Sequence, residues 1–361
     1  MPLNLSHKGY SALSKLALAS LAVCSFTTAA NELGKSAESQ ASEKINWRDK
    51  GWELVWQDEF NDAKLDRSKW NVVVNCWGGG NNEQQCYVDK PDNFEFENGK
   101  LHIVARKEEH TGPAERERSP NYDPNNTKTL PYTSGRIRTN NKGDWKYGRF
   151  EARMKLPYGQ GTWPAFWMLP TDEDYGGWAA SGEIDIMEAV NIGAKTDANG
   201  KLSDAPETRI HGTLHYGAAW PNNVYTGTAY KPPGGFSPAT GYHTYAVEWE
   251  EGEIRWYMDD VHYATQTAEG WYSEYTDEAG NKVRRPQPAP FDKRYHLIFN
   301  NAVGGAWASN VNEKGIDPDI FPQRLSIDYV RVYQCSKDPE TGKGCASISE
   351  GAKLVKPGDG H

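Results

Sequence analysis

The stretch Arg149-Phe-Glu-Ala-Arg-Met-Lys-Leu156 alternates polar and apolar residues, and this pattern decides the fold class. Successive side chains of a β-strand point to opposite faces, so the alternation predicts a strand with one face in the core. The same pattern recurs over residues 163–169, 254–258, 295–299 and 325–329. Gly, Pro, Asn and Asp clusters separate these segments, and helical periodicity is almost absent. We therefore predict an all-β fold, a sandwich of antiparallel sheets.

The first thirty residues differ from the rest of the chain. Lys8 and Lys15 precede a short apolar run, residues 16–23, and small residues end at Ala30. This order predicts a secretory signal peptide over residues 1–30. Cys24 makes a lipoprotein anchor the less favoured alternative, because Val23 fits poorly before a lipidated cysteine.

The remaining chain reads as one domain with polar ends. Residues 31–45 lack periodicity and are predicted to be a linker, and residues 46–335 to be the catalytic domain. Residues 336–361 contain little apolar material beyond a cysteine loop, so we expect a C-terminal tail. Four cysteines lie in two locally spaced pairs, Cys76 with Cys86 and Cys335 with Cys345, and are expected to be structural disulfides.

The charge of the chain limits its partners. Without residues 1–30, which hold two of its 40 basic and none of its 49 acidic residues, the net charge is 38 − 49 = −11. An acidic surface repels phosphate backbones, so we expect no nucleic-acid partner, whereas a neutral polymer remains compatible. No later segment is long and apolar enough to span a membrane, and we expect a monomer that is extracellular or periplasmic. The chain is rich in Trp and Tyr, which suits the binding of sugar rings.

The segment Ser181-Gly-Glu-Ile-Asp-Ile-Met-Glu188 carries three carboxylates on a strongly β-prone run. In a regular strand Glu183 and Asp185 share a face, but Glu188 points into the core. Since burying an unpaired carboxylate is costly, we infer a one-residue bulge near Ile186 and Met187 that returns Glu188 to the face of Glu183.

The bulge also predicts the type of reaction. Four strand steps separate the Cα atoms of Glu183 and Glu188 by about 13 Å. Side chains that lean inward leave about 5 Å between the carboxyl groups, the separation of retaining glycosidases. Asp185, between them, is expected to share a proton or hydrogen bond. A solvated acidic surface and a calcium site are the alternatives, but Trp163, Trp167 and Trp178 nearby favour a sugar cleft.

The segment Gly182-Glu-Ile-Asp-Ile-Met-Glu188 resembles the signature of glycoside hydrolase family 16. Its two residues between Asp185 and Glu188 are similar to the laminarinase, agarase and carrageenase branches. Further similar stretches are Trp56-Gln-Asp-Glu-Phe60, Ser134-Gly-Arg-Ile-Arg-Thr139, Tyr147-Gly-Arg-Phe-Glu-Ala-Arg153, Gly161-Thr-Trp-Pro-Ala-Phe-Trp-Met-Leu-Pro170, His211-Gly-Thr-Leu-His-Tyr-Gly217 and Asn301-Ala-Val-Gly-Gly305. The resemblance implies a β-jelly-roll with a concave cleft and retention of configuration. It also implies that Glu183 is the nucleophile, Glu188 the acid/base and Asp185 the assisting carboxylate.

Five further residues are candidates for binding substrate. Trp163 and Trp167 share a strand face and are expected to stack on glucose rings rather than pack in the core. Arg136 is equally compatible with glucan hydroxyls and with a salt bridge. His215 lies on one polar face with Arg209, His211 and Thr213, so it is expected to border the acids. The resemblance implies a sugar-binding asparagine in the loop of residues 78–83, either Asn81 or Asn82.

The resemblance also implies a structural calcium ion, since positions similar to its ligands are Glu59, the carbonyl of Gly99, and Asp328. No cofactor is expected for catalysis.

Three functions compete. The first is an endo-β-1,3-glucanase that acts on laminarin, with mixed-linkage β-1,3-1,4-glucan as a further substrate. The second is another hydrolase of the bulged branch, an agarase or carrageenase, although the charge of −11 disfavours a sulfated substrate. The third is a non-catalytic glucan-binding protein, and the presence of all three acids argues against it.

Overall fold

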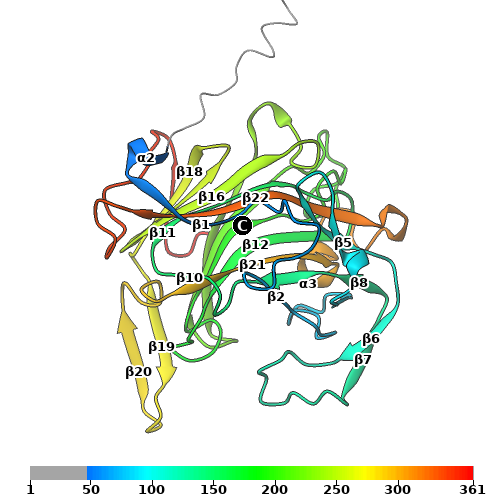
Figure 1. The fold of residues 1–361 in the computed structure, drawn as a ribbon, viewed down its shortest axis with the longest axis horizontal. Helices are drawn as coiled ribbons and strands as arrows, with labels where there is room; N and C mark the ends of the chain where they lie inside the picture. Colours follow the sequence, from blue (N-terminus) through cyan, green and yellow to red (C-terminus); the bar gives the residue numbers. More distant parts are fainter. Residues whose placement is uncertain (1–46, 361) are drawn as a thin grey trace, which may run out of the picture. The chain divides into compact units, whose positions relative to one another are not determined.

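The computed structural model describes residues 47–360. The predicted signal peptide, the linker and Cys24 lie outside these residues. Two large, mostly antiparallel sheets stack face to face (Figure 1), which confirms the predicted all-β sandwich. In this part of the chain no helix has the length and apolar character needed to cross a membrane.

One sheet has nine strands, in the order β23-β18-β17-β16-β11-β22-β5-β4, and β1 pairs with β22. Its strands are β1 (Trp52–Asp58), β4 (Phe94–Phe96), β5 (Leu101–Ala105), β11 (Gly148–Lys155), β16 (His243–Glu250), β17 (Glu253–Met258), β18 (Val261–Thr267), β22 (Gln323–Cys335) and β23 (Lys353–Val355).

The other sheet has ten strands, in the order β2-β9-β21-β12-β13-β14-β19-β20, with β10 paired to β21 and β15 paired to β14. Its strands are β2 (Asn71–Val72), β9 (Arg136–Arg138), β10 (Asp144–Trp145), β12 (Thr162–Pro170), β13 (Glu183–Glu188), β14 (Ile210–Ala218), β15 (Asn223–Tyr230), β19 (Tyr272–Thr276), β20 (Lys282–Pro286) and β21 (Tyr295–Val303).

Small elements complete the fold. Two short pairs are β3 (Gln85–Tyr87) with β8 (Tyr132–Ser134) and β6 (His110–Pro113) with β7 (Thr127–Leu130). The helical turns are α2 (Trp47–Lys50), η1 (Pro91–Asn93), η2 (Pro233–Gly235), α3 (Gly305–Ala308) and η3 (Pro318–Ile320). In Figure 1 the hairpins β6–β7 and β19–β20 extend away from the stacked sheets.

The core fills the space between the two sheets, as the alternating pattern predicts. From β11 it receives Phe150, Ala152 and Met154, and from β13 it receives Ile184 and Met187, all fully buried. Burial of each large apolar side chain stabilises the fold by about 1.5–3 kcal/mol. The acid-bearing strand is therefore held rigidly by its apolar face.

The opposite, polar face of β11 is also covered. Arg149 is fully buried and forms ion pairs with Glu151 and Glu248 at 2.7 and 3.2 Å. The C-terminal segment contributes to this cover, because the N–H of Ser347 donates to Glu248 and its carbonyl accepts from Tyr257.

The expectation that residues 336–361 form a trailing tail is wrong for residues 336–360. Lys353–Val355 form β23, which pairs in parallel with β18, and Val355 is buried. Farther on, the carbonyl of Asp359 accepts from the N–H of Gly227 in β15. The sequence pattern missed this segment because most of its contacts use backbone groups, which leave no hydrophobic signature.

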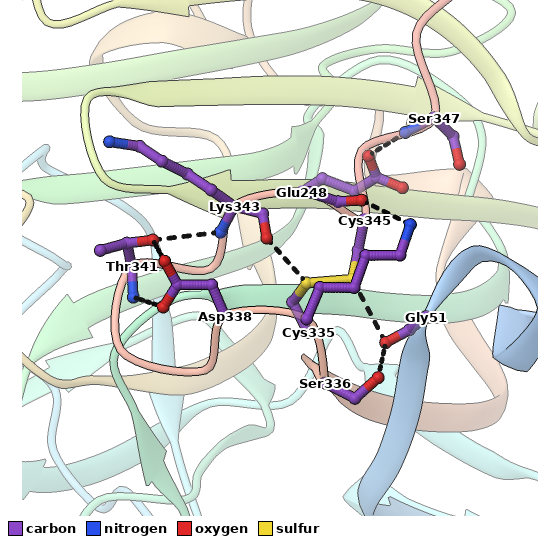
Figure 2. Close-up of a disulfide and its surroundings, with 11 residues drawn as sticks. Gly51, Glu248, Cys335, Ser336, Asp338, Thr341, Lys343, Cys345 and Ser347 are labelled. Atoms are coloured by element: carbon purple, nitrogen blue, oxygen red, sulfur yellow. Dashed lines mark hydrogen bonds between the residues drawn. A yellow bond between two sulfur atoms is a disulfide. The ribbon is translucent and has the colours of Figure 1, made fainter.

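Both predicted disulfides are present, Cys76–Cys86 and Cys335–Cys345. Figure 2 shows the second one, where the Gly51 carbonyl before β1 accepts a hydrogen bond from the Ser336 hydroxyl and lies 3.2 Å from Sγ of Cys345. This bridge therefore ties the start of the C-terminal segment to the first strand of the domain.

Candidate active site

A β-bulge places the three acids of β13 on one face. Asp185 lies opposite Trp167 and Thr213 of the two neighbouring strands, whereas Glu188 lies opposite Ala165 and His211. Each neighbour advances two residues while β13 advances three, so β13 contains one extra residue. The predicted bulge near Ile186 is confirmed, and Ile186 is buried as expected.

Two tryptophans donate hydrogen bonds to the glutamates. The indole Nε1 of Trp178 lies 2.6 Å from Oε2 of Glu183, and Nε1 of Trp163 lies 2.9 Å from Oε1 of Glu188. Each glutamate is therefore held in one orientation by a rigid, half-buried ring. Trp178 belongs to the turn before β13, and Trp163 belongs to β12.

Asp185 lies between the glutamates and is almost completely buried. Its Oδ2 lies 3.4 Å from Nε2 of His215, which is also 4.0 Å from Oε1 of Glu183. The backbone carbonyl of Asp185 accepts from the indole of Trp256 in the opposite sheet. His215 thus borders the acids, as predicted.

Burial and mutual repulsion raise the pKa of all three carboxyl groups. For Glu183, burial and the neighbouring Asp185 raise the pKa, while His215 and the Trp178 hydrogen bond oppose the rise. For Asp185, burial and Glu188 raise the pKa. For Glu188, burial raises the pKa, and the Trp163 hydrogen bond opposes it. The cluster therefore retains protons at pH values where isolated carboxyl groups are ionised.

A cleft extends from the acids across β12 and β21 to β9. It is lined by Gly79, Asn81, Glu83, Tyr87, Arg136, Trp163, Ala165, Trp167, Glu183, Asp185, Glu188, Asn300 and Ala302. The structure thus brings together seven of the eight residues predicted for catalysis and substrate binding, and the eighth, His215, contacts the acids from β14.

The two tryptophans of β12 are half-buried cleft residues rather than core residues. The indole of Trp167 donates to Asn300 at 2.7 Å, and the guanidinium of Arg136 lies 4.7 Å from its ring centre. Among the described residues Arg136 makes cation–π contacts with Trp167 and Tyr87 rather than a salt bridge. Trp163 packs edge to face with Trp307 of α3.

The loop of residues 78–83 forms one wall of the cleft. Asn81 lines the cleft, whereas Asn82 adopts a positive φ of 56° and serves the turn. The carbonyl of Asn81 accepts from the N–H of Ala306, which ties the loop to α3. Of the two asparagines, Asn81 is therefore the one that faces the cleft.

Sequence reasoning missed a fourth carboxylate in this wall. Glu83 is buried and accepts hydrogen bonds from Gln85 and Tyr87, and its charge also raises the pKa of Glu188. The hydrogen bond from Trp178 to Glu183 was missed as well. Glu83 and Trp178 lie in glycine-rich loops, and the conformation of such loops cannot be predicted from a periodic pattern in the sequence.

The two carboxylates predicted to bind calcium, Glu59 and Asp328, form ion pairs instead. Both oxygens of Glu59 accept from Arg331 at 2.8 and 2.9 Å, and Asp328 pairs with Arg153 and, at 3.4 Å, with Lys100. A calcium ion would have to displace these cations from both carboxylates. The arrangement therefore does not fit a calcium site, although the oxygen donors themselves suit the ion.

Two glutamates on one strand face, held by indole N–H groups in an open cleft of a jelly-roll sandwich, define the site of a glycoside hydrolase. Comparison with known proteins agrees, since the model of glycosyl hydrolases family 16 matches residues 80–284. The chain belongs to this family. Its glycosidases work with two carboxyl groups and need no cofactor for catalysis.

Individual relatives cover most of the chain. Glucan endo-1,3-beta-glucosidase A1 of Niallia circulans is 40% identical over 79% of this chain, which spans only 38% of that relative. The beta-glucanase of Rhodothermus marinus is 40% identical over 78% of this chain and 85% of its own length. The solved laminarinase of Rhodothermus marinus is 35% identical, covers 78% of this chain and 97% of its own, and has a TM-score of 0.56.

Proposed function

We propose that this protein is an endo-acting β-1,3-glucanase that hydrolyses laminarin-type glucan with retention of configuration, and that it also accepts mixed-linkage β-1,3-1,4-glucan. The observation that carries the proposal is the bulged strand β13, which places Glu183 and Glu188 on one face of a tryptophan-lined cleft. The endo-1,3-beta-glucosidase and laminarinase names of relatives at 35–40% identity support the substrate.

The site suits a double displacement. Glu183 attacks the anomeric carbon while Glu188 gives its proton to the glycosidic oxygen, so the leaving chain departs with a hydrogen. Glu188 then removes a proton from water, and the water oxygen displaces Glu183 from the sugar. The Trp178 hydrogen bond and the nearby His215 favour the anionic form of Glu183.

Asp185 helps to keep Glu183 ionised as the nucleophile and Glu188 protonated as the acid. Three buried carboxyl groups cannot all be ionised in such close contact. A proton retained by Asp185 lowers the repulsion on Glu183, and burial keeps Glu188 protonated at a higher pH than a free glutamic acid. We assign four residues to substrate binding because they line the cleft, namely Trp163, Trp167, Arg136 and Asn81. We assign His215 to the same role because it contacts the acids.

Reducing-end release by the purified protein from laminarin, mixed-linkage glucan and agarose tests the substrate. We expect rapid release from laminarin, slower release from mixed-linkage glucan and none from agarose. Release from agarose alone would identify an agarase, and binding of laminarin without release would identify a recognition protein. NMR of the first product should show the β-anomer, and an α-anomer would contradict the double displacement.

We also infer that the mature protein is a monomer that acts outside the cytoplasm. Its two disulfides suit an oxidising compartment. We expect a hydrodynamic radius no larger than that of one folded chain of 361 residues. We also expect to recover the protein from the culture medium or the periplasm.

A further inference from the structure

Aromatic residues continue the cleft on the side of the acids that faces β15. In the strand register Glu183 pairs with His215 of β14, and His215 pairs with Tyr225 of β15. Directly paired residues of adjacent strands share a face, so these three side chains form a row across the sheet. The ring centres of His215 and Tyr225 lie 5.9 Å apart, which agrees with this row. The ring centre of Trp178 lies 5.6 Å from that of His215.

Tyr225 is an exposed aromatic residue of β15. Its side chain is 50% exposed, and the next positions of β15 on the same face are Gly227 and Ala229. Gly227 is buried and donates its N–H to the carbonyl of Asp359, so the C-terminal segment runs beside this part of β15. Gly360 lies close to the Tyr225 ring, because a Cβ atom at this position would be 3.4 Å from Cε2 of Tyr225, so the C-terminal segment packs against the ring.

Trp220 lies in the turn that joins β14 to β15 and is 73% exposed, although it is a large aromatic residue. Its backbone N–H is 3.4 Å from the carbonyl of Trp178, the residue whose indole donates to Glu183. An exposed indole beside a sugar cleft offers an apolar face and an N–H donor, which is the combination that a pyranose ring uses.

We propose that Tyr225 and Trp220 form a second arm of the substrate cleft, which binds sugar units of the glucan chain beyond those joined by the cleaved bond. Tyr225 is two strand spacings, about 10 Å, from Glu183 across the sheet, too far to contact the reacting sugar. The inference rests on the proposed β-1,3-glucanase function, and it predicts that the two residues determine how the enzyme responds to chain length.

The test compares kcat/KM on β-1,3-linked trisaccharide and on laminarin for the variants Tyr225→Ala and Trp220→Ala. Activity of the unmodified protein on laminarin is measured first, so a failure of the proposed function is seen separately. We expect each variant to lose about 3- to 10-fold on laminarin, from the worth of one aromatic contact, and less than about 2-fold on trisaccharide. Tyr225→Phe and Trp220→Phe should retain most of the laminarin activity.

Two controls separate binding from folding and from catalysis. Tyr158→Ala removes an aromatic side chain that is 57% exposed and belongs to the turn between β11 and β12, outside the cleft lining, and should change neither activity. Calorimetric binding of a long β-1,3-glucan oligosaccharide to Glu183→Gln, with and without Tyr225→Ala, should show the same weakening without turnover. Equal losses on short and long substrates, or no loss on laminarin, would overturn the second arm.

Discussion

At the scale of single residues, the main feature of the cleft is a cluster of three carboxyl groups whose pKa values are raised. Glu183, Asp185 and Glu188 share one face of β13, and the indoles of Trp178 and Trp163 donate hydrogen bonds to the two glutamates. Such a cluster is costly for the fold and useful for the reaction, because one group must be an acid and its neighbour a nucleophile.

Replacing Glu183 with Gln should lower kcat on laminarin by roughly 10³-fold or more, since the amide cannot form the glycosyl bond. The same change should stabilise the protein near neutral pH. Burial raises the folded-state pKa of Glu183 above its unfolded value of about 4.3, so the folded state binds the proton more tightly. The contribution of Glu183 to the stability of the unmodified protein is therefore full below a pH of about 4 and is lost as the pH rises through the folded-state pKa.

Thermal unfolding from pH 4 to pH 8 measures this effect. The Tm of Glu183→Gln should match that of the unmodified protein at pH 4 and exceed it increasingly toward pH 8. Glu278→Gln, at an exposed position, is the control and should show no such trend. A Tm difference that is independent of pH would refute the role of the buried charge.

Glu188→Gln should affect substrates according to their leaving groups. Turnover of laminarin should fall by about 10²- to 10⁴-fold, because the departing sugar needs a proton. An aryl β-glucoside with an acidic phenol needs none, so its first step should be nearly unchanged. Burst kinetics on both substrates give the measurement, and equal losses on the two would argue against Glu188 as the acid.

At the scale of elements, the short strand β23 completes the nine-stranded sheet and carries the C-terminal segment toward β15. Val355 is 4% exposed, while its neighbour Leu354 is 50% exposed. Val355 is the one buried residue of this strand, so β23 contacts the core at a single position, which is too little for a pattern to be detected in the sequence.

Val355→Ala should lower the free energy of unfolding by about 1.5 kcal/mol, from the loss of two buried carbon groups. Leu354→Ala removes a larger but exposed side chain and should cost less than about 0.5 kcal/mol. Denaturant unfolding of both variants is the measurement. If Leu354→Ala proves to be the more destabilising change, the packing of β23 described here is incorrect.

At the scale of the whole molecule, ion pairs join segments that are distant in the sequence at the place where a calcium ion was expected. Arg331 of β22 pairs with Glu59, which follows β1, and Lys100 and Arg153 pair with Asp328. Because these cations neutralise both carboxylates, the fold does not require a divalent ion at this place.

We therefore expect the Tm to change by less than about 2 °C between excess chelator and millimolar calcium. A bound ion at 1,000 times its dissociation constant would contribute about 4 kcal/mol and shift the Tm by several degrees. Calorimetric scans under both conditions decide the point, with Glu59→Gln as the matched variant. A large calcium-dependent rise that Glu59→Gln abolishes would restore the predicted metal site.

The sequence by itself determined the fold class, both disulfides, the acid strand and its bulge. Each of these follows from local rules, namely alternation along a strand, short spacing between cysteines, and the cost of a carboxylate in the core. Only the tertiary structure decided that Trp178 and Trp163 donate hydrogen bonds to the glutamates and that Glu83 lines the cleft. It also decided that Arg331 forms an ion pair with Glu59 and that residues 336–360 belong to the domain. Those contacts join segments far apart or lie in irregular loops, so they depend on how the two sheets pack, which no local pattern records.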